Sequence, residues 1–322
     1  MKKILITGAC GYLGAWLSKY LAEKGYRIFA FVKKKPSDNI EWTSLVDEII
    51  IGDICDEETI AKLTSLNIDV VIHLISLDHH KSENDPNFVS SINVLPTWIL
   101  LDQFKKCGLN KFIYFSTIHI YGELYNNVIK ESYNSMPVNT YALTHLLSEN
   151  ICNYYNNITN IDCINLRLSN SYGSPVFSEN NCWWLVLNDL CKTAYQEKRI
   201  KLISDGSPLR DFIHISDICR ATELLIKSKN DFKNNIFNIS SGETLSVLEL
   251  AHAVKSIYLK RYNREIEIHL PDNSLSKNPH NIKDQEKFVI DNSRITALGF
   301  EKKLSLKMGI NEIFDYFDLL SK

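Results

Sequence analysis

The sequence lacks a long apolar run and has no excess of charge of either sign. The apolar stretch after Lys2 and Lys3 stops at Gly8, which is too short for a secretory signal, and no other stretch approaches the length of a membrane span. A formal net charge of −2 gives no reason to expect nucleic acid or an anionic membrane as a partner. We therefore expect a cytoplasmic protein that binds neither nucleic acid nor a membrane.

Paired cysteines are also missing. The eight cysteines include no C-x-x-C pair and no Cys/His group at zinc spacing. Most are flanked by apolar residues, which is typical of buried, reduced thiols rather than disulfides or metal ligands. We predict no metal site, and Cys10, which lies in a glycine-rich loop, has no expected catalytic role.

What is present is an alternation of short apolar runs and segments with helical periodicity. The apolar runs fall at residues 3–7, 26–32, 47–51, 69–75, 111–116 and 162–167. Helical segments fall between them, and this alternation predicts a parallel sheet covered by helices on both faces. From about Ser169 the alternation loosens, so we predict a dinucleotide-binding domain over 1–168 and a smaller lobe over 169–322, with some chain crossing back. The polar stretch from Asp272 to Asp284 is predicted to be an exposed loop.

A glycine-rich segment at residues 8–14, GACGYLG, follows the first predicted strand and opens the first predicted helix. This is the context of a dinucleotide fingerprint. Gly8 permits a tight turn, Gly11 lets the backbone approach a pyrophosphate, and Gly14 lets the helix pack close to the strand. A purely structural glycine turn is the alternative. We predict that the loop binds a dinucleotide through these glycines together with Cys10, Tyr12 and Leu13.

The second predicted strand ends without a carboxylate. NAD selectivity usually comes from an acidic residue there, which bonds the ribose 2′-hydroxyl. Instead Lys33, Lys34 and Lys35 follow, and these could meet a 2′-phosphate. The lysines favour NADP(H), with NAD(H) possible, and a solvated basic turn is the alternative. Asp53 and Ile54, after the third strand, are placed to hold the adenine.

Downstream, Thr117 ends the fifth strand, and Tyr141 and His145 are four residues apart on a predicted helix. With the glycine loop, they resemble the extended short-chain dehydrogenase/reductases that act on nucleotide sugars, over nearly the whole chain. The resemblance implies an α/β fold, a Rossmann-type doubly wound parallel sheet with a smaller C-terminal nucleotide-sugar-binding lobe. It implies Thr117 as the hydroxyl that orients the substrate oxygen and Tyr141 as the general acid/base. It further implies cofactor contacts from Leu74 and Ser76 and a substrate contact from Asn93.

His145 stands where the family has a lysine. Tyr141 must exchange a proton with a sugar oxygen during hydride transfer, and a nearby ammonium normally lowers the phenol pKa. An imidazole can bond the nicotinamide ribose, but it is cationic only near or below neutrality. We consider three interpretations: a functional variant with His145 in the lysine role, a weakened or specialised enzyme, and a non-catalytic dinucleotide sensor.

A second departure narrows the reaction. Nucleotide-sugar 4,6-dehydratases of this family carry Asp-Glu directly after the threonine, whereas this chain has Ile118-His119. Because neither side chain supplies a carboxyl group, we expect no dehydratase activity, and we place both residues near the substrate. His79, His80 and Lys81 lie where the family's loop approaches the sugar, although an exposed polar loop is equally consistent.

The second half carries further matches to the family. Asn170 matches an asparagine that contacts the sugar diphosphate, and Arg210 matches an arginine that clamps the diphosphate or ribose. The alternative for Arg210 is a structural pair with Asp211. Trp183 and Trp184 could stack on a base or sugar, but an apolar helix start predicts that they pack in the core.

Together these features predict an enzyme. We expect an NAD(P)-dependent oxidoreductase acting at C4 of a nucleotide-diphosphate-linked hexose or heptose, as a 4-keto-sugar reductase in deoxysugar or surface-polysaccharide precursor synthesis. A C4-epimerase with retained NAD is the alternative within the same class. A non-catalytic dinucleotide-binding regulatory module is the alternative of another class. The resemblance also implies a homodimer.

Overall fold

The computed structural model describes residues 1–34, 40–125, 127–228, 235–271 and 287–321. Lys35 and the predicted loop from Asp272 to Asp284 lie outside the described residues. The chain forms two compact units. The first contains residues 1–123, 131–168 and 219–238, and the second contains residues 124–130, 169–218 and 239–322.

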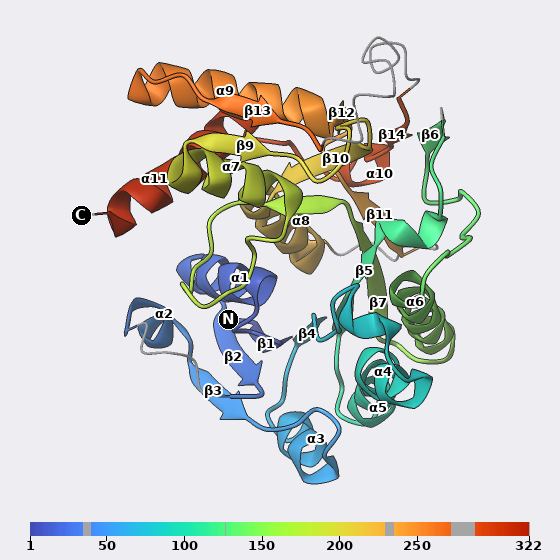
Figure 1. Cartoon of the computed structure of the whole chain (residues 1–322). Helices are drawn as coiled ribbons and strands as arrows, with labels where there is room; N and C mark the ends of the chain where they lie inside the picture. The colour runs from blue at the N-terminus through green and yellow to red at the C-terminus, as the bar shows by residue number, and fades with distance from the viewer. Residues whose placement is uncertain (35–39, 126, 229–234, 272–286, 322) are drawn as a thin grey trace. The chain divides into compact units, whose positions relative to one another are not determined.

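The first unit is built on a seven-stranded sheet (Figure 1). Its strands, in spatial order, are β11 (Ile236–Ile239), β7 (Asp162–Leu168), β5 (Lys111–Thr117), β4 (Val70–His73), β1 (Lys3–Thr7), β2 (Arg27–Val32) and β3 (Glu48–Ile51). The pairings from β7 through to β3 are all parallel. From β1 the chain first adds β2 and β3 on one side of the sheet and then returns to add β4, β5 and β7 on the other side, as in doubly wound folds. This confirms the predicted Rossmann-type parallel sheet.

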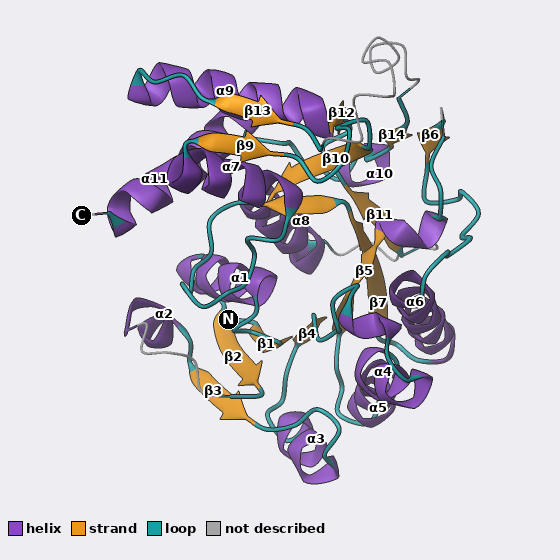
Figure 2. Cartoon of the chain, viewed as in Figure 1, coloured by secondary structure: helices purple, strands orange, loops and turns teal. Residues whose placement is uncertain are grey.

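Helices cover this sheet on its faces (Figure 2). They are α1 (Tyr12–Glu23), α2 (Ile40–Leu45), α3 (Glu57–Thr64), α4 (Pro86–Asn93), α5 (Leu95–Phe104), α6 (Thr140–Ile158) and the C-terminal part of α8 (Ile215–Lys227). α1 contacts α2, while α5 contacts both α3 and α6. The buried strand residues need cover on both sides because β4 and β5 are buried along their whole length.

Strand register aligns several polar side chains in the first unit. Thr7 of β1 pairs with His73 of β4, and His73 pairs with Tyr114 of β5. The Thr7 hydroxyl lies 2.7 Å from Nδ1 of His73. These polar residues lie toward the carboxyl ends of the strands, which is the edge where ligands bind in open α/β sheets.

The second unit is a smaller mixture of strands and helices. Its strands are β6 (Val128–Ile129), β8 (Asn170–Tyr172), β9 (Arg199–Lys201), β10 (Leu209–His214), β12 (Thr244–Ser246), β13 (Glu267–His269) and β14 (Val289–Ile290). Its helices are α7 (Val186–Glu197), α9 (Val247–Tyr262), α10 (Ser293–Thr296) and α11 (Leu306–Leu320). Ser246 caps α9 with a full capping box, which fixes where that helix begins. α7, α9 and α11 contact one another and enclose this unit's core.

Candidate active site

The glycine loop between β1 and α1 has the geometry of a phosphate cradle. Gly8 has φ of +71°, a conformation that glycine adopts without strain. A Cβ at Gly14 would lie 2.1 Å from the carbonyl oxygen of Gly8, so only glycine lets α1 approach the strand this closely. Gly11 is the N-cap of α1 and provides no side-chain cap, so the first N–H groups of the helix have no side-chain acceptor at the cap.

These residues fit a dinucleotide. The uncapped N-terminus of α1 offers N–H donors and partial positive charge to a pyrophosphate. Leu74 lies beside the loop, since a Cβ at Gly8 would be 3.7 Å from the Leu74 Cβ. The predicted cofactor contacts Cys10, Tyr12 and Leu13 are half-buried at the start of this helix.

The end of β2 presents a lysine that already has a partner. Lys33 Nζ lies 2.9 Å from an Asp53 carboxylate oxygen, and the Lys33 side chain is 72% exposed. A hydrogen bond from the Cys55 backbone N–H, together with the bond from Lys33, lowers the pKa of Asp53. Lys34 is exposed and Ile54 is buried. The positive charge at this turn is therefore partly neutralised by Asp53.

Tyr141 and His145 lie on one face of α6, as their spacing predicts. Their ring centroids are 4.5 Å apart and their planes meet at 66°. Asn139 caps this helix by accepting a hydrogen bond from the Ala142 N–H at 2.8 Å, which fixes Tyr141 in the first turn. Tyr141 is half-buried, whereas His145 is only 3% exposed.

The electrostatics of this pair differ from those of a tyrosine beside an ammonium. Burial lowers the pKa of His145 to about 3, and His119 acts in the same direction. His145 is thus a neutral imidazole at physiological pH. Burial also raises the pKa of Tyr141 to about 12, and a hydrogen bond with Thr117 opposes that rise. Thr117 at the end of β5 therefore reaches the Tyr141 hydroxyl, and the phenol is protonated.

Two more histidines surround Tyr141. The rings of His79 and His119 each lie 6.3 Å from the Tyr141 ring in edge-on orientation. Both histidines are exposed. The structure therefore brings three of the predicted site histidines around one tyrosine.

Other predicted substrate contacts in this region have different surroundings. Ile118 is buried. His80 is exposed beside His79 at a ring distance of 5.7 Å, and Lys81 pairs with Asp78 at 3.3 Å. Their proposed contacts with a substrate stay predictions.

Asn93, another predicted substrate contact, is 1% exposed. Its side-chain oxygen accepts from the Leu77 N–H at 2.8 Å, and its amide nitrogen donates to Ser82 and Thr144. Asn93 therefore ties the segment after β4 to α6. Its contact with a ligand stays a prediction.

In the second unit, Asp211 is held by neighbours other than Arg210. The Asp211 carboxylate accepts from the Ser169 hydroxyl at 2.7 Å, from Ser241 and from the Glu243 N–H at 3.1 Å. Arg210 precedes it on β10, donates to the Leu209 carbonyl, and has its pKa lowered by burial. The Asp211 carboxylate thus holds Ser169 and the turn at residues 241–243 in place.

The other predicted residues of the second unit are also placed. The Asn170 amide donates to the Asp211 carbonyl at 3.0 Å. The Trp183 ring lies tilted against Phe317 at a centroid distance of 4.9 Å. Trp183 therefore packs in the core, as its sequence context predicts. The core prediction is wrong for Trp184, which is 54% exposed. The roles of Asn170 and Arg210 in binding a ligand stay predictions.

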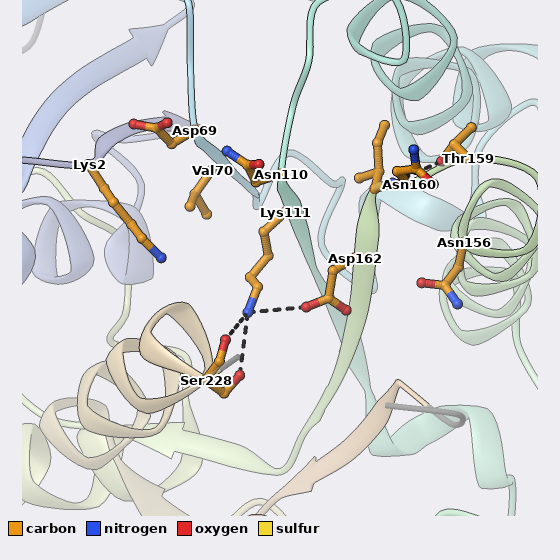
Figure 3. Close-up of a pocket in the computed structure, with 11 residues that line it drawn as sticks. Lys2, Asp69, Val70, Asn110, Lys111, Asn156, Thr159, Asn160, Asp162 and Ser228 are labelled. Carbon is orange, nitrogen blue, oxygen red and sulfur yellow. Dashed lines mark hydrogen bonds and ion pairs between the residues drawn. The ribbon is translucent and has the colours of Figure 1, made fainter. Parts of the chain in front are cut away.

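A pocket of about 700 Å³ lies in the first unit at the amino ends of β4, β5 and β7 (Figure 3). Lys111, at its base, donates to the carbonyls of Leu225 and Ser228 and pairs with Asp162 at 3.1 Å. The pocket is at the opposite end of the strands from Tyr141 and the glycine loop. Its central charge is satisfied by the protein itself, so we assign it no part in catalysis.

Sequence reasoning missed two residues of the site. Tyr114 of β5 bonds His145, with its hydroxyl 2.8 Å from Nδ1, and His73 stands beside Tyr114 at a ring distance of 6.0 Å. Both interrupt the apolar runs of buried strands, KFIYFST and VVIH. That interruption is the signal that could have found them.

The described residues carry no cluster of three His, Cys, Asp or Glu side chains arranged to hold a metal. Across the same ranges, none of the helices is both long and apolar enough to cross a membrane. All eight cysteines are free thiols.

Comparison with known proteins places this geometry in context. A sequence profile of the NAD dependent epimerase/dehydratase family matches residues 4–240. The chain is 24% identical over 315 residues to a putative UDP-glucose 4-epimerase of Methanocaldococcus jannaschii, covering 97% of both chains. It is 26% identical over 330 residues to the dTDP-D-glucose 4,6-dehydratase of Mus musculus, covering 98% of this chain and 88% of the relative.

A solved structure is similar over nearly the whole chain. It is the UDP-glucuronic acid 4-epimerase of Bacillus cereus in complex with UDP-glucuronic acid and NAD. The two chains are 25% identical, each is covered to 99%, and the TM-score is 0.81.

Proposed function

Because the chain belongs to the NAD-dependent epimerase/dehydratase family, we propose that it is an oxidoreductase acting at C4 of a nucleotide-diphosphate sugar. The observation that carries the proposal is the grouping of Thr117, Tyr141 and His145 near the carboxyl ends of the parallel strands. The dinucleotide is proposed to lie on the glycine loop, whose fit to a pyrophosphate supports this placement.

The bound dinucleotide would supply the hydride acceptor or donor. Tyr141 is proposed to give the proton to the C4 oxygen, and Thr117 to orient that oxygen through its hydroxyl. His145 is proposed to donate a hydrogen bond to the nicotinamide ribose. Because burial raises its pKa to about 12, Tyr141 is protonated and can act as the acid when a hydride is delivered to a 4-keto sugar. Reduction of a 4-keto sugar is therefore our first choice.

A C4-epimerase that retains its cofactor is the second candidate. It is favoured by the similarity of the chain to the 4-epimerases of Methanocaldococcus jannaschii and Bacillus cereus. Dehydration is disfavoured by Ile118 and His119, since Ile118 is buried and has no proton to donate. The mouse relative is a dehydratase, so the distinction has to be tested directly.

The test is incubation with a panel of nucleotide sugars and their 4-keto derivatives, with NADH or NADPH present. Stoichiometric oxidation of the cofactor with a reduced sugar product supports the reductase. An isomerised sugar without net oxidation supports the epimerase, and loss of water supports a dehydratase. A folded protein that binds dinucleotide but is silent across the panel contradicts the proposal and favours a non-catalytic regulatory module.

The choice between NADP(H) and NAD(H) depends on Lys33 and Lys34. The sequence favours NADP(H), whereas the Lys33–Asp53 ion pair reduces the charge available to a 2′-phosphate. If Lys33 does hold that phosphate, Lys33→Asp should weaken NADPH binding roughly tenfold and leave NADH binding within about twofold. Equal effects on the two dissociation constants would exclude this role and leave NAD(H).

We also propose a homodimer formed by α5 and α6. The two helices contact each other, and both carry exposed apolar side chains at helical spacing. They are Leu95, Trp98, Ile99, Leu143, Leu147, Tyr154 and Ile158. Light scattering on Leu147→Glu should show a monomer, with Leu259→Glu on α9 as the exposed apolar control. A monomeric unmodified chain would contradict the proposal.

A further inference from the structure

Both ring nitrogens of His145 make hydrogen bonds to side chains of the first unit. Nδ1 lies 2.8 Å from the Tyr114 hydroxyl, and Nε2 lies 3.2 Å from the Ser76 hydroxyl oxygen. Tyr114 and His145 are almost fully buried. A neutral imidazole carries its proton on one nitrogen and accepts at the other, so these partners decide which nitrogen is the donor.

The side-chain partners favour one arrangement, and a further hydrogen bond, between His145 and the Phe115 backbone, needs a ring N–H as its donor because a carbonyl only accepts. The Ser76 hydroxyl donates to the Leu77 carbonyl at 3.0 Å, a group that can only accept. With its single proton directed there, the Ser76 oxygen can accept from Nε2, which assigns the imidazole proton to Nε2. Nδ1 is then bare and accepts from Tyr114. Burial raises the pKa of Tyr114 well above its usual value, so its hydroxyl stays protonated and able to donate.

The position of Tyr114 is fixed by its strand. Its strand, β5, pairs with β4 on one side and with β7 on the other. His73 is in register with Tyr114, and its ring lies 6.0 Å away. The Tyr114 ring in turn lies 5.8 Å from the His145 ring. The hydroxyl is therefore presented to α6 from the most buried part of the sheet.

We propose that Tyr114 is a positioning residue that holds His145 in the Nε2–H tautomer, so that an uncharged imidazole presents a donor beside Ser76. A lysine ammonium has three donors and needs no such partner, whereas an imidazole donates only from its protonated nitrogen. The acceptor, the ribose of the dinucleotide, rests on the proposed function. The tautomer itself does not depend on turnover.

The test is long-range ¹H–¹⁵N correlation NMR on ¹⁵N-histidine-labelled, ligand-free protein, which distinguishes a bare ring nitrogen from a protonated one. The His145 signals are assigned by their loss in His145→Gln. We expect a bare Nδ1 and a protonated Nε2 that do not titrate between about pH 6 and about pH 8. A protonated Nδ1 in the unmodified protein would overturn the proposal.

Tyr114→Phe removes the donor and keeps the ring. We expect a mixture of the two tautomers and dinucleotide binding weakened roughly tenfold, measured by calorimetry. Tyr155→Phe is the matched control, because Tyr155 is buried in the same core cluster and its hydroxyl bonds Asp102 instead. An unchanged tautomer in Tyr114→Phe would also overturn the proposal. The expected tautomer in a protein that turns over no nucleotide sugar would contradict the proposed function alone.

Discussion

The two ends of the seven-stranded sheet both hold buried polar side chains, but in opposite electrostatic states. At the amino ends, Lys111 donates to the carbonyls of Leu225 and Ser228 and forms an ion pair with Asp162, while burial lowers its pKa. Figure 3 draws its contacts with Ser228 and Asp162. At the carboxyl ends, His145 is held neutral and Tyr141 protonated. Removing one partner of a buried ion pair destabilises the fold, whereas neutral groups that can change protonation are suited to proton transfer.

The largest effect is expected at the carboxyl ends. Tyr141→Phe should lower turnover by roughly 10²–10⁴-fold, because the proton donor to the C4 oxygen is lost. The free energy of unfolding and the dissociation constant for the dinucleotide should change little, since Tyr141 is half-buried and the ring remains. Steady-state kinetics and calorimetry measure both. Full activity in this variant would remove Tyr141 from the reaction.

A second prediction concerns acid stability at the same end. Burial lowers the pKa of both His73 and His145 to about 3, from an ordinary 6.5. Between about pH 6.5 and about pH 3 the two histidines therefore bind protons in the unfolded chain but not in the folded chain. Stability is fully present above about pH 6.5 and is lost as the pH falls toward about 3. Between pH 7 and pH 5 each histidine should cost about 2 kcal/mol.

Urea unfolding at the two pH values checks this. His145→Asn should remove about half of the pH dependence, and His252→Asn, at an exposed position on α9, should remove none. If the unmodified chain has the same urea midpoint at both pH values, the two buried imidazoles are not held neutral.

At the amino ends of the strands we expect a substitution to lower stability and leave turnover unchanged. Lys111→Met should lower the free energy of unfolding by about 1–3 kcal/mol, because Asp162 and the two carbonyls lose their donor. Dinucleotide binding and turnover should stay unchanged. Lys105→Met, at a more exposed ion pair with Asp102, should change stability by less than about 0.5 kcal/mol. A loss of dinucleotide affinity in Lys111→Met would show that the two ends are coupled.

The smallest effect is expected when a positive charge is added at the carboxyl ends of the strands. His145→Lys places an ammonium near Tyr141, which should lower the phenol pKa and shift the pH profile of turnover to lower pH by about one unit. The variant should retain part of its activity. A folded variant with no activity would show that the site is built around the uncharged imidazole and does not accept a cation.

The fold and the elements of the site could be predicted because they rest on local patterns. Apolar runs between helices predict the parallel sheet. The spacing of Gly8, Gly11 and Gly14 predicts a tight turn, and the structure shows that a Cβ at Gly14 would clash with the Gly8 carbonyl. The spacing of Tyr141 and His145 likewise predicts their shared face.

Contacts between distant segments could not be predicted in this way. The bond from Tyr114 to His145 joins residues 31 positions apart, and it depends on how α6 packs on β5. The pairing of Lys33 with Asp53 depends on the register of β2 and β3. In both cases the residues were visible in the sequence, but their partners were set by tertiary packing.

The return of the chain to the first unit at residues 219–238 has a consequence for synthesis on the ribosome. β11 is the neighbour of β7 in the sheet, so β7 is an open edge until β11 has been made. The intervening stretch of about 70 residues takes roughly 4–14 s to translate. During that interval a nascent chain ending soon after Leu168 exposes an unpaired strand. A fragment that ends there should therefore aggregate through this strand edge.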